Sequence, residues 1–505
     1  MKTPILGAAY VARSVNAAAN RCVNLFPEVV PEGGKEPAFL QRCPGLELTA
    51  IVGTGPIRGM WKFGDFLYVA SGGKLYRVDG NYAITELGLI NGSGPVSMAD
   101  NGVQLFVACN PDAFIYNANT GVFAQVTDPD FPGAVSVGYL DSYFVFNEPN
   151  SQRVWVTSLL NGLAVDPLDF ASAEGNPDDI VSLIVDHREV WLFGNNTIEV
   201  WYNAGLADFP LARIEGAFME IGCLAPYSVA KLDNSVFWLG SDARGNGIVY
   251  RNQGYNGQRI STHAVEWQIQ QYAVLNDAIG YSYQQDGHSF YVLVFPTAQA
   301  TWVFDVSTGL WHERAYWDGV QYRRHRSNCQ ANFNGQVLVG DWENGFIYAF
   351  SQDTYNDNGE AQRWLRSWRA LPTGQNTLKR TAHHTLQLDC ESGVGAGTVD
   401  TFFLLTENSE NLTTEGGQQI VTSLISLTDG ANPQVMLRWS DDGGHTWSNE
   451  HWTRMGRAGE YGKRVIWRRL GMTTKLRDRV YEISGSDPVK IAIMGAELSA
   501  TPTSA

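Results

Sequence analysis

Residues 57–78 contain three short apolar segments separated by two turns: Ile57-Arg58-Gly59-Met60-Trp61-Lys62-Phe63, Gly64-Asp65, Phe66-Leu67-Tyr68-Val69-Ala70, Ser71-Gly72-Gly73 and Lys74-Leu75-Tyr76-Arg77-Val78. The segments are rich in β-branched and aromatic residues, and both turns contain glycine. This pattern predicts three antiparallel strands joined by hairpins. Similar units begin near Pro95, Ala134, Asp179, Pro226, Ala278 and Asn328. One structural theme therefore recurs through the first two thirds of the chain.

The units follow one another at intervals of about 40 residues, which is the length of a four-stranded propeller blade. One such sheet cannot bury both of its faces alone, so the sheets must stack around an axis. The fold class that we predict is all-β: a β-propeller of six or seven blades, with an N-terminal extended arm and a C-terminal β-rich domain. A β-sandwich array or a β-solenoid is the alternative, but solenoid repeats are shorter and more regular.

Changes in composition divide the chain into three expected parts. Residues 1–50, rich in Ala, Asn and Pro, form the arm, and residues 51–355 form the propeller. Residues 356–505 form a β-rich assembly domain with a long loop at 391–430 that is rich in Gly, Thr and Asn. Within this last part, residues 361–368 are expected to form a short helix.

The charge of the chain is uneven. The net charge is −16, which argues against a dedicated nucleic-acid-binding protein, because affinity for phosphate comes from clustered Lys and Arg. Residues 450–490 hold ten basic and five acidic residues, so this window is +5 and the remainder is −21. We expect the window to dock on an acidic neighbour, including a second copy of the chain, rather than on nucleic acid. The assembly contacts are assigned to Arg464, Arg468, Arg469, Arg477 and Arg479.

The six cysteines are scattered and include no C-x-x-C pair, which fits reduced thiols in a protein assembled in a cytoplasm. The apolar stretch 5–12 is too short for a convincing signal peptide, and no apolar run has the length of a transmembrane helix. We therefore expect a soluble protein without a membrane span, and neither a metal nor a cofactor is predicted.

The most specific local motif is Ser440-Asp441-Asp442-Gly443-Gly444-His445-Thr446-Trp447, which fits the S-x-D-x-G-x-T-W pattern of an Asp-box hairpin. Its expected structural residues are Ser440, Asp442, Gly444, Thr446 and Trp447. The Asp carboxylate would accept backbone N–H groups, Gly would allow positive φ, and Trp would pack beneath the turn. Sialidase propellers carry several such motifs, whereas this chain has one, located after the propeller. We therefore predict a structural turn that supplies no catalytic group.

Catalytic motifs are absent from the sequence. Glycoside hydrolysis needs two carboxylates on either side of a bond, and no spacing pairs Glu199, Asp305, Glu313 or Asp318. The chain has no H-E-x-x-H, G-x-S-x-G or Walker A sequence. We predict that the protein is not an enzyme. A sialidase-like or depolymerase glycoside hydrolase and a receptor-binding tail protein are the alternatives.

Short segments along the chain resemble the tail accessory factors, or packaged-DNA stabilisation proteins, of short-tailed bacteriophages. The resemblance rests on five segments taken together: Asn24-Leu25-Phe26-Pro27-Glu28 with Pro44-Gly45, Gly72-Gly73-Lys74-Leu75-Tyr76, Gly92-Ser93-Gly94-Pro95-Val96-Ser97-Met98-Ala99, Phe193-Gly194 with Thr197-Ile198-Glu199, and Lys463-Arg464-Val465-Ile466-Trp467-Arg468-Arg469-Leu470-Gly471. The loop at 391–430 departs from the family pattern and leaves its contacts open.

This resemblance implies a virion protein, assembled in the host cytoplasm, that forms a hexameric nozzle ring in the phage tail. The ring would dock on the adaptor below the portal and would carry tailspikes or fibres and a tail needle or plug. It would retain packaged DNA and later form the channel for genome ejection. DNA would pass through the lumen without sequence recognition, and an acidic lumen would keep it from binding.

Overall fold

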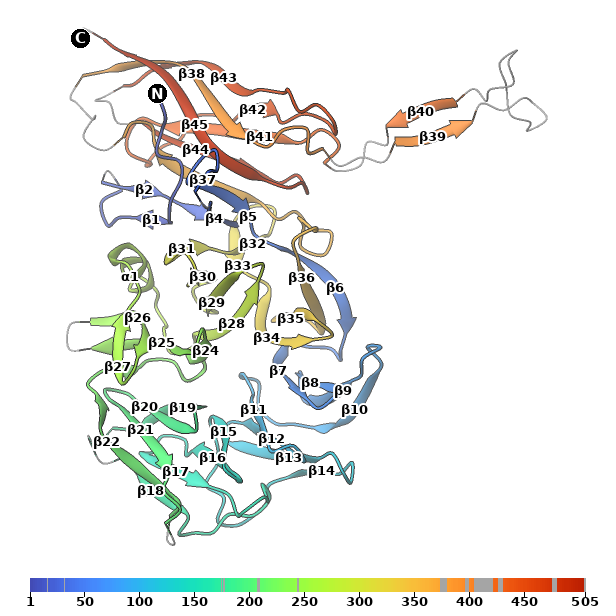
Figure 1. The fold of residues 1–505 in the computed structure, drawn as a ribbon, viewed down its shortest axis with the longest axis vertical. Helices are drawn as coiled ribbons and strands as arrows, with labels where there is room; N and C mark the ends of the chain where they lie inside the picture. The colour runs from blue at the N-terminus through green and yellow to red at the C-terminus, as the bar shows by residue number, and fades with distance from the viewer. Residues whose placement is uncertain are drawn as a thin grey trace. The chain divides into compact units, whose positions relative to one another are not determined.

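The computed structural model describes the chain except residues 16, 31, 174, 176–177, 207–208, 243–244, 373–378, 396–398, 404–420, 426–429, 475–478 and 504–505. The chain divides into two units (Figure 1). Residues 46–351 form the propeller unit, and residues 1–45 together with 352–505 form the sandwich unit. No helix among the described residues is long and apolar enough to cross a membrane.

The described residues of the propeller unit contain seven blades, each built from four or five strands. The first blade consists of β7 (Ile57–Phe63), β8 (Phe66–Ser71), β9 (Lys74–Val78) and β10 (Ile84–Leu89). The second consists of β11 (Ser97–Asp100), β12 (Gln104–Cys109), β13 (Asp112–Asn117) and β14 (Phe123–Gln125). The third consists of β15 (Val137–Leu140), β16 (Tyr143–Asn147), β17 (Arg153–Val156) and β18 (Phe170–Ser172).

The fourth to sixth blades follow in chain order. They are β19 (Ile180–Asp186), β20 (Glu189–Gly194), β21 (Ile198–Asn203) and β22 (Leu211–Met219); β23 (Gly222–Cys223), β24 (Ala230–Leu232), β25 (Ser235–Asp242), β26 (Gly245–Gln253) and β27 (Asn256–Arg259); and β28 (Ile279–Gln285), β29 (His288–Phe295), β30 (Ala300–Asp305) and β31 (Leu310–Glu313). The short helices η1 (Pro226–Ser228) and α1 (His263–Ile269) and the hairpin β32 (Ala315–Trp317) with β33 (Tyr322–Arg324) lie between strands.

The seventh blade closes the ring with strands from both ends of the propeller unit. β34 (Ser327–Phe333), β35 (Gln336–Asp341) and β36 (Phe346–Ser351) are joined at the outer edge by β6 (Gly45–Ile51). Asn328 Nδ2 donates to the Ile57 carbonyl at 3.0 Å and so links the seventh blade to the first. The predicted six or seven blades are therefore seven, and the fold class is an all-β propeller.

The core of the propeller lies between adjacent blades. Phe106 of the second blade packs against Phe144 and Phe146 of the third, with ring centroids 5.4 and 6.0 Å apart. The segments nearest the axis approach closely: a Cβ at Gly280 of β28 would lie 2.3 Å from the carbonyl oxygen of Ser228 in η1, which leaves room only for glycine. The aromatic and β-branched residues of the repeated units are thus buried between sheets.

The hairpins that join the first two strands of a blade explain part of the sequence pattern. The pairs Asp141-Ser142, His187-Arg188 and Asp233-Asn234 have positive φ at both central residues, as a type I′ turn requires. This turn matches the twist of the flanking strands and therefore keeps each blade tightly paired.

The sandwich unit is built from two sheets. One has the strand order β4 (Leu25–Val29), β5 (Ala38–Arg42), β45 (Ala492–Pro502), β38 (Thr381–Cys390) and β43 (Val465–Met472). The other contains β3 (Cys22–Val23), β37 (Trp364–Arg369), β44 (Val480–Gly485), β41 (Gln434–Ser440) and β42 (His451–Arg454). A small hairpin, β1 (Tyr10–Val11) with β2 (Ala19–Asn20), precedes them.

The N-terminal segment differs from the expected separate arm. Its strands β3, β4 and β5 are integral to the two sheets of the sandwich unit, and β6 belongs to the propeller. Arg42, fully buried, donates to the carbonyls of Val489 and Gln362 and so fastens β5 to the C-terminal part of the chain. The N-terminal segment is too short to form a hydrophobic core of its own, so its side chains are buried against strands that are distant in the sequence.

Two further expectations differ from the structure. Residues 364–369 form β37 instead of a short helix, because Trp364 and Trp368 are buried in a strand paired with β44. In the expected loop 391–430, residues 399–403 (β39) and 421–425 (β40) pair as a hairpin. The loop's residues 396–398, 404–420 and 426–429 lie outside the described part of the chain.

Candidate assembly surfaces and axial cavity

An axial cavity of about 820 Å³ lies at the centre of the propeller unit. Its walls are the innermost segments of all seven blades, and they include Arg58, Asp100, Asp141, Arg188 and Lys231. Arg58 donates to the carbonyls of Gly72, Asn91 and Gly94. Asn91 and Gly94 lie in the connection between the first two blades, and Gly72 lies in the turn between β8 and β9. The guanidinium therefore holds both segments against β7.

Carboxylates in the wall of the cavity are held by neighbouring blades. Asp141 binds the Arg188 guanidinium through both oxygens, at 2.9 and 2.8 Å. Asp100 accepts the Trp61 indole N–H at 2.8 Å. Each bond crosses from one blade to the next, so these groups stabilise the ring at the end where the first hairpin of each blade lies.

The carboxylates considered for glycoside hydrolysis occupy separate places. Glu199, on β21, is buried and accepts the backbone N–H of Gly175 and the indole N–H of Trp201. Asp305, on β30, is buried against His288 at 2.9 Å. Asp318 lies in a turn whose backbone N–H groups and Arg323 lower its pKa to about 2. Glu313 ends β31. None of the four lines the axial cavity. The hydrogen bonds given for Glu199, Asp305 and Asp318 hold neighbouring parts of the fold together.

The Asp-box turn follows β41 in the sandwich unit. Asp442 Oδ1 accepts the Ser440 hydroxyl at 2.6 Å and the backbone N–H groups of His445 and Thr446, each at 2.9 Å. Asp442 Oδ2 accepts the Thr446 hydroxyl at 2.6 Å. The hydrogen bond from the Ser440 hydroxyl, followed by those from the hydroxyl and the backbone N–H of Thr446, holds the pKa of Asp442 well below its ordinary value. Gly444 has φ +109°, in the region that favours glycine.

Trp447 ends the Asp-box motif and is half-buried. The Arg438 guanidinium lies over its ring at 4.7 Å from the centroid, and Arg438 also binds Glu482 of the neighbouring strand β44. The turn therefore packs onto its own sheet through a cation–π contact as well as through hydrogen bonds.

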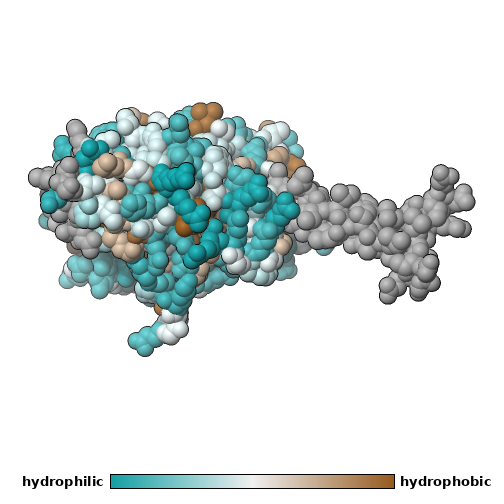
Figure 2. Space-filling view, turned by 90° about the horizontal axis from the view of Figure 1, so that it is seen from above, coloured by the Kyte–Doolittle hydropathy of each residue, from teal (hydrophilic) through white to brown (hydrophobic). Residues whose placement is uncertain are grey.

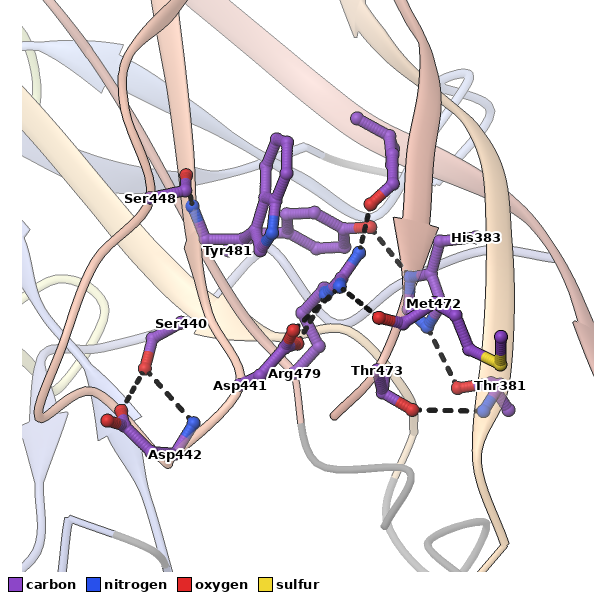
Figure 3. Close-up of polar contacts among 12 residues, drawn as sticks. Thr381, His383, Ser440, Asp441, Asp442, Ser448, Met472, Thr473, Arg479 and Tyr481 are labelled. Atoms are coloured by element: carbon purple, nitrogen blue, oxygen red, sulfur yellow. Dashed lines mark hydrogen bonds and ion pairs between the residues drawn. The ribbon is translucent and has the colours of Figure 1, made fainter. Parts of the chain in front are cut away.

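A buried polar cluster connects this turn to the other sheet (Figure 3). Arg479, which directly precedes β44, binds both carboxylate oxygens of Asp441, at 2.6 and 2.9 Å. Its guanidinium also donates to the carbonyls of Leu470 and Met472 on β43, at 2.6 and 3.3 Å. Since β43 and β44 belong to different sheets, one side chain fastens the Asp-box turn and both sheets together.

His383 provides a second connection between the sheets. Its Nδ1 lies 2.7 Å from the Tyr481 hydroxyl and its Nε2 lies 3.0 Å from the Thr381 hydroxyl. Burial first, and then the charge of Arg479, lower the pKa of His383 to about 3, so the ring is neutral at pH 7. Burial also raises the pKa of Tyr481. A neutral histidine and a neutral phenol can share this hydrogen bond without burying a further charge.

The expected assembly contacts are found in three different situations. Arg464, Arg468 and Arg469 are exposed on or beside β43, the edge strand of its sheet. Arg479 is 2% exposed, so it cannot contact a partner protein, and its assignment is corrected to an internal fastener. Arg477 lies outside the described residues. The sequence shows equal basic character at all five positions, and only burial distinguishes them.

Some residues of these surfaces have no signal in the sequence that we recognised. Asp441 is as much a part of the Asp-box turn as Asp442, but it lies outside the motif's required positions. The separation of 38 residues between Asp441 and Arg479 hides their pairing.

The geometry defines a class of protein: a closed, seven-bladed propeller linked to a β-sandwich in which the polar clusters described above fasten strands to one another. Residues 1–355 match the family described as bacteriophage P22 Gp10, β-propeller, and residues 408–501 match bacteriophage P22 Gp10, β-sandwich. The chain belongs to this family of tail accessory factors, which are structural proteins of the phage tail and components of the virion.

Solved structures show more distant likenesses. The chain is 14% identical to the computationally designed Ika8 protein over 61% of this chain and 100% of that one, with a TM-score of 0.38. It is 12% identical to YCF48 bound to D1 peptide, over 61% and 97% of the two chains, with a TM-score of 0.39. It is 8% identical to PorZ of Porphyromonas gingivalis, over 66% of this chain and 44% of that one, with a TM-score of 0.36. No curated protein matches the chain.

Proposed function

We propose that the chain is a nozzle subunit of a short phage tail, which forms a hexameric ring below the portal and the adaptor. The ring retains packaged DNA and becomes the channel for genome ejection. The observation that carries this proposal is the family match over residues 1–355, which spans the complete closed propeller. A closed propeller also suits the role, because its hydrogen-bonded blades form a rigid body with loops at both ends for neighbouring subunits.

The distribution of charge supports a channel through which DNA slides. The propeller unit, residues 46–351, contains thirty-one Asp and Glu and fifteen Lys and Arg, for a net charge of −16. The sandwich unit contains twenty-one of each and is neutral. We propose that acidic propeller surfaces face the lumen, where they repel the phosphate backbone. The neutral unit, with its exposed basic strand, is left to contact proteins: the adaptor, tailspikes or fibres, and a needle or plug.

Electron microscopy tests the proposed role. Negative-stain images of the purified chain should show six-fold rings, and virions labelled on this chain should show the label at the tail, below the portal. A virion lacking the chain should release its DNA after packaging. Label on the head, or stable retention of DNA without the chain, would contradict the proposal.

A further inference from the structure

One loop of the third blade exposes an unusual number of large apolar side chains. Residues 157–169, which connect β17 to β18 and are called the leucine loop here, contain four exposed leucines: Leu159 (61% exposed), Leu160 (57%), Leu163 (38%) and Leu168 (76%). Single exposed leucines are common on protein surfaces, but a group of four in thirteen residues is typical of an interaction site.

The loop is held in place by its own backbone. Val156 N–H donates to the Asp169 carbonyl, Ser158 N–H to the Ala164 carbonyl, and Leu160 N–H to the Ser142 carbonyl of the adjacent hairpin. Val165, in the middle of the loop, is buried and donates to the Asp128 carboxylate. Val165 anchors the loop, so its backbone is ordered while the four leucine side chains stay exposed. These side chains are therefore available to another protein.

The surroundings of the leucine loop are acidic. Between residues 126 and 220 the chain has fifteen Asp and Glu, three Arg and no Lys, a net charge of −12. Asp166 lies within the leucine loop, and Asp130 lies two residues after Asp128, whose carboxylate binds the loop. Both are exposed. Burial and the neighbouring Asp166 carboxylate raise the pKa of Asp169, and an approaching cation would relieve this repulsion. The leucine loop and its surroundings are therefore complementary to a partner surface that is both apolar and basic.

The sandwich unit presents such a surface at the side formed by β42, β43 and the residues between them, called the basic edge here. Trp467 Nε1 of β43 donates to the His451 carbonyl of β42 at 2.8 Å, which keeps the two edge strands together. Large apolar side chains are exposed here: Trp452 (54%), Tyr461 (77%) and Met472 (45%). Residues 451–472 contain six Lys and Arg and one Glu. The face of the molecule seen in Figure 2 is mainly hydrophilic, with a few separate apolar groups.

The edge strand β43 is unsuited to pairing with another strand. A bulge interrupts its pairing with β38 between His383 and Thr385, and Arg469, at the bulge, has φ 59°. Bulges and charged side chains are the usual means of preventing strand addition at a sheet edge. A partner would therefore be bound by side chains, through guanidinium groups and the exposed rings.

We propose that the basic edge of one copy docks on the leucine loop of the next copy. The two surfaces are complementary in charge, and each exposes apolar groups that the other can cover. Since they are different surfaces of the same chain, the contact is head-to-tail and generates a ring if the rotation closes. The inference rests on the proposed function, which requires a ring, and adds the surfaces that build it.

Reciprocal charge reversal tests the contact in the full-length chain. One variant carries Arg464→Glu and Arg468→Glu on the basic edge, and leaves Arg469 with its positive φ unchanged. The other carries Asp130→Lys and Asp166→Lys beside the leucine loop. Each variant alone would place like charges opposite each other, and should raise the protein concentration needed for ring formation at least about tenfold. Mass photometry and negative-stain images measure ring formation.

Mixing the two variants should restore the ring. Each restored contact joins one variant to the other, so the subunits must alternate and the mixture must assemble in a one-to-one ratio, which an even-numbered ring permits. Restoration also shows that both variants are folded. Two controls match the change in net charge elsewhere: Lys2→Glu with Arg13→Glu in the sandwich unit, and Asp65→Lys with Asp286→Lys on other blades. Both controls should assemble like the wild type.

The outcomes separate this inference from the proposed function. If both reversal variants still form rings as the wild type does, or if their mixture does not assemble, these two surfaces do not dock on each other. The proposed ring would then be built by other surfaces. A wild-type chain that forms no ring, free or in virions, would overturn the proposed function itself. In a further variant, Leu159→Ser with Leu168→Ser should weaken assembly without lowering the thermal stability of the monomer, because both side chains are exposed.

Discussion

Arg479 shows how one side chain decides the integrity of the sandwich unit. It is buried and binds the Asp441 carboxylate together with two carbonyls of β43. A buried ion pair gains little over an apolar packing, but removal of one partner leaves the other charge and the carbonyls without compensation. The strength of such a cluster is therefore seen when it is broken.

We expect Arg479→Met to lower the free energy of unfolding by about 3 kcal/mol, because it leaves Asp441 and the β43 carbonyls without their donor. Urea denaturation followed by tryptophan fluorescence measures the change. Arg454→Met, an exposed substitution in the same unit, should change the stability by less than about 0.5 kcal/mol. Equal stability of the two variants would show that the cluster contributes nothing.

Buried histidines predict a loss of stability in acid. Burial lowers the pKa of His383, in the sandwich unit, and of His325, in the propeller unit, to about 3 in each case. In the unfolded chain each of these histidines has the ordinary pKa of 6.5 and binds a proton below that pH, whereas in the folded chain it stays neutral down to about pH 3. The free energy of unfolding should therefore fall by up to about 1.4 kcal/mol per pH unit per histidine between pH 6.5 and pH 3.

Substitution of one histidine measures its share of this slope. His383→Asn should make the dependence of stability on pH shallower by about one proton below pH 6, whatever its effect at pH 7. The wild-type protein is the reference for the slope. Identical slopes in His383→Asn and the wild type would mean that His383 binds a proton in the folded protein as it does in the unfolded chain.

At the level of elements, β6 closes the propeller from the opposite end of the chain. It is the outer strand of the seventh blade, beside β36. Leu46 is fully buried, whereas Leu48, two residues later, is 38% exposed. The seventh blade combines this one strand from the start of the propeller sequence with three strands from its end. Loss of β6 would therefore open the circle of blades.

We expect Leu46→Ala to lower the stability of the propeller unit by about 2–5 kcal/mol, as other buried Leu→Ala changes do. Leu48→Ala should cost less than about 1 kcal/mol, because less apolar surface is lost there. Thermal unfolding and limited proteolysis report both effects, with cleavage expected first near residues 46–56 in Leu46→Ala. A protein that tolerates both changes equally would not depend on β6 for closure.

At the level of the whole molecule, the acidic propeller should keep DNA from binding. The assembled ring should show no retention of double-stranded DNA in a mobility-shift assay at 50 mM salt, where electrostatic attraction is strongest. A control ring made from variants with Asp→Lys changes on the propeller should bind DNA, with an affinity that falls as salt increases. Tight DNA binding by the wild-type ring would contradict an acidic lumen.

The repeated strand units and the Asp-box turn could be predicted from the sequence because both are local. A two-residue turn such as Asp233-Asn234, or the carboxylate of Asp442 with Thr446, involves neighbours within four positions, and residue type alone indicates the geometry. The same local reading was wrong for residues 364–369, where burial between strands overrode a helical pattern. Tertiary packing outweighs intrinsic preference at such buried positions.

The sequence by itself determined the all-β class, the propeller period of about 40 residues and the acidic charge, because these are properties of strands, turns and composition. Only the tertiary structure decided that seven blades close the ring, that the first 45 residues belong to the sandwich unit, and that Arg479 is buried while Arg464 and Arg468 are exposed. The reason is physical: closure, strand pairing over hundreds of residues and burial are set by contacts between distant segments, and no local pattern carries them.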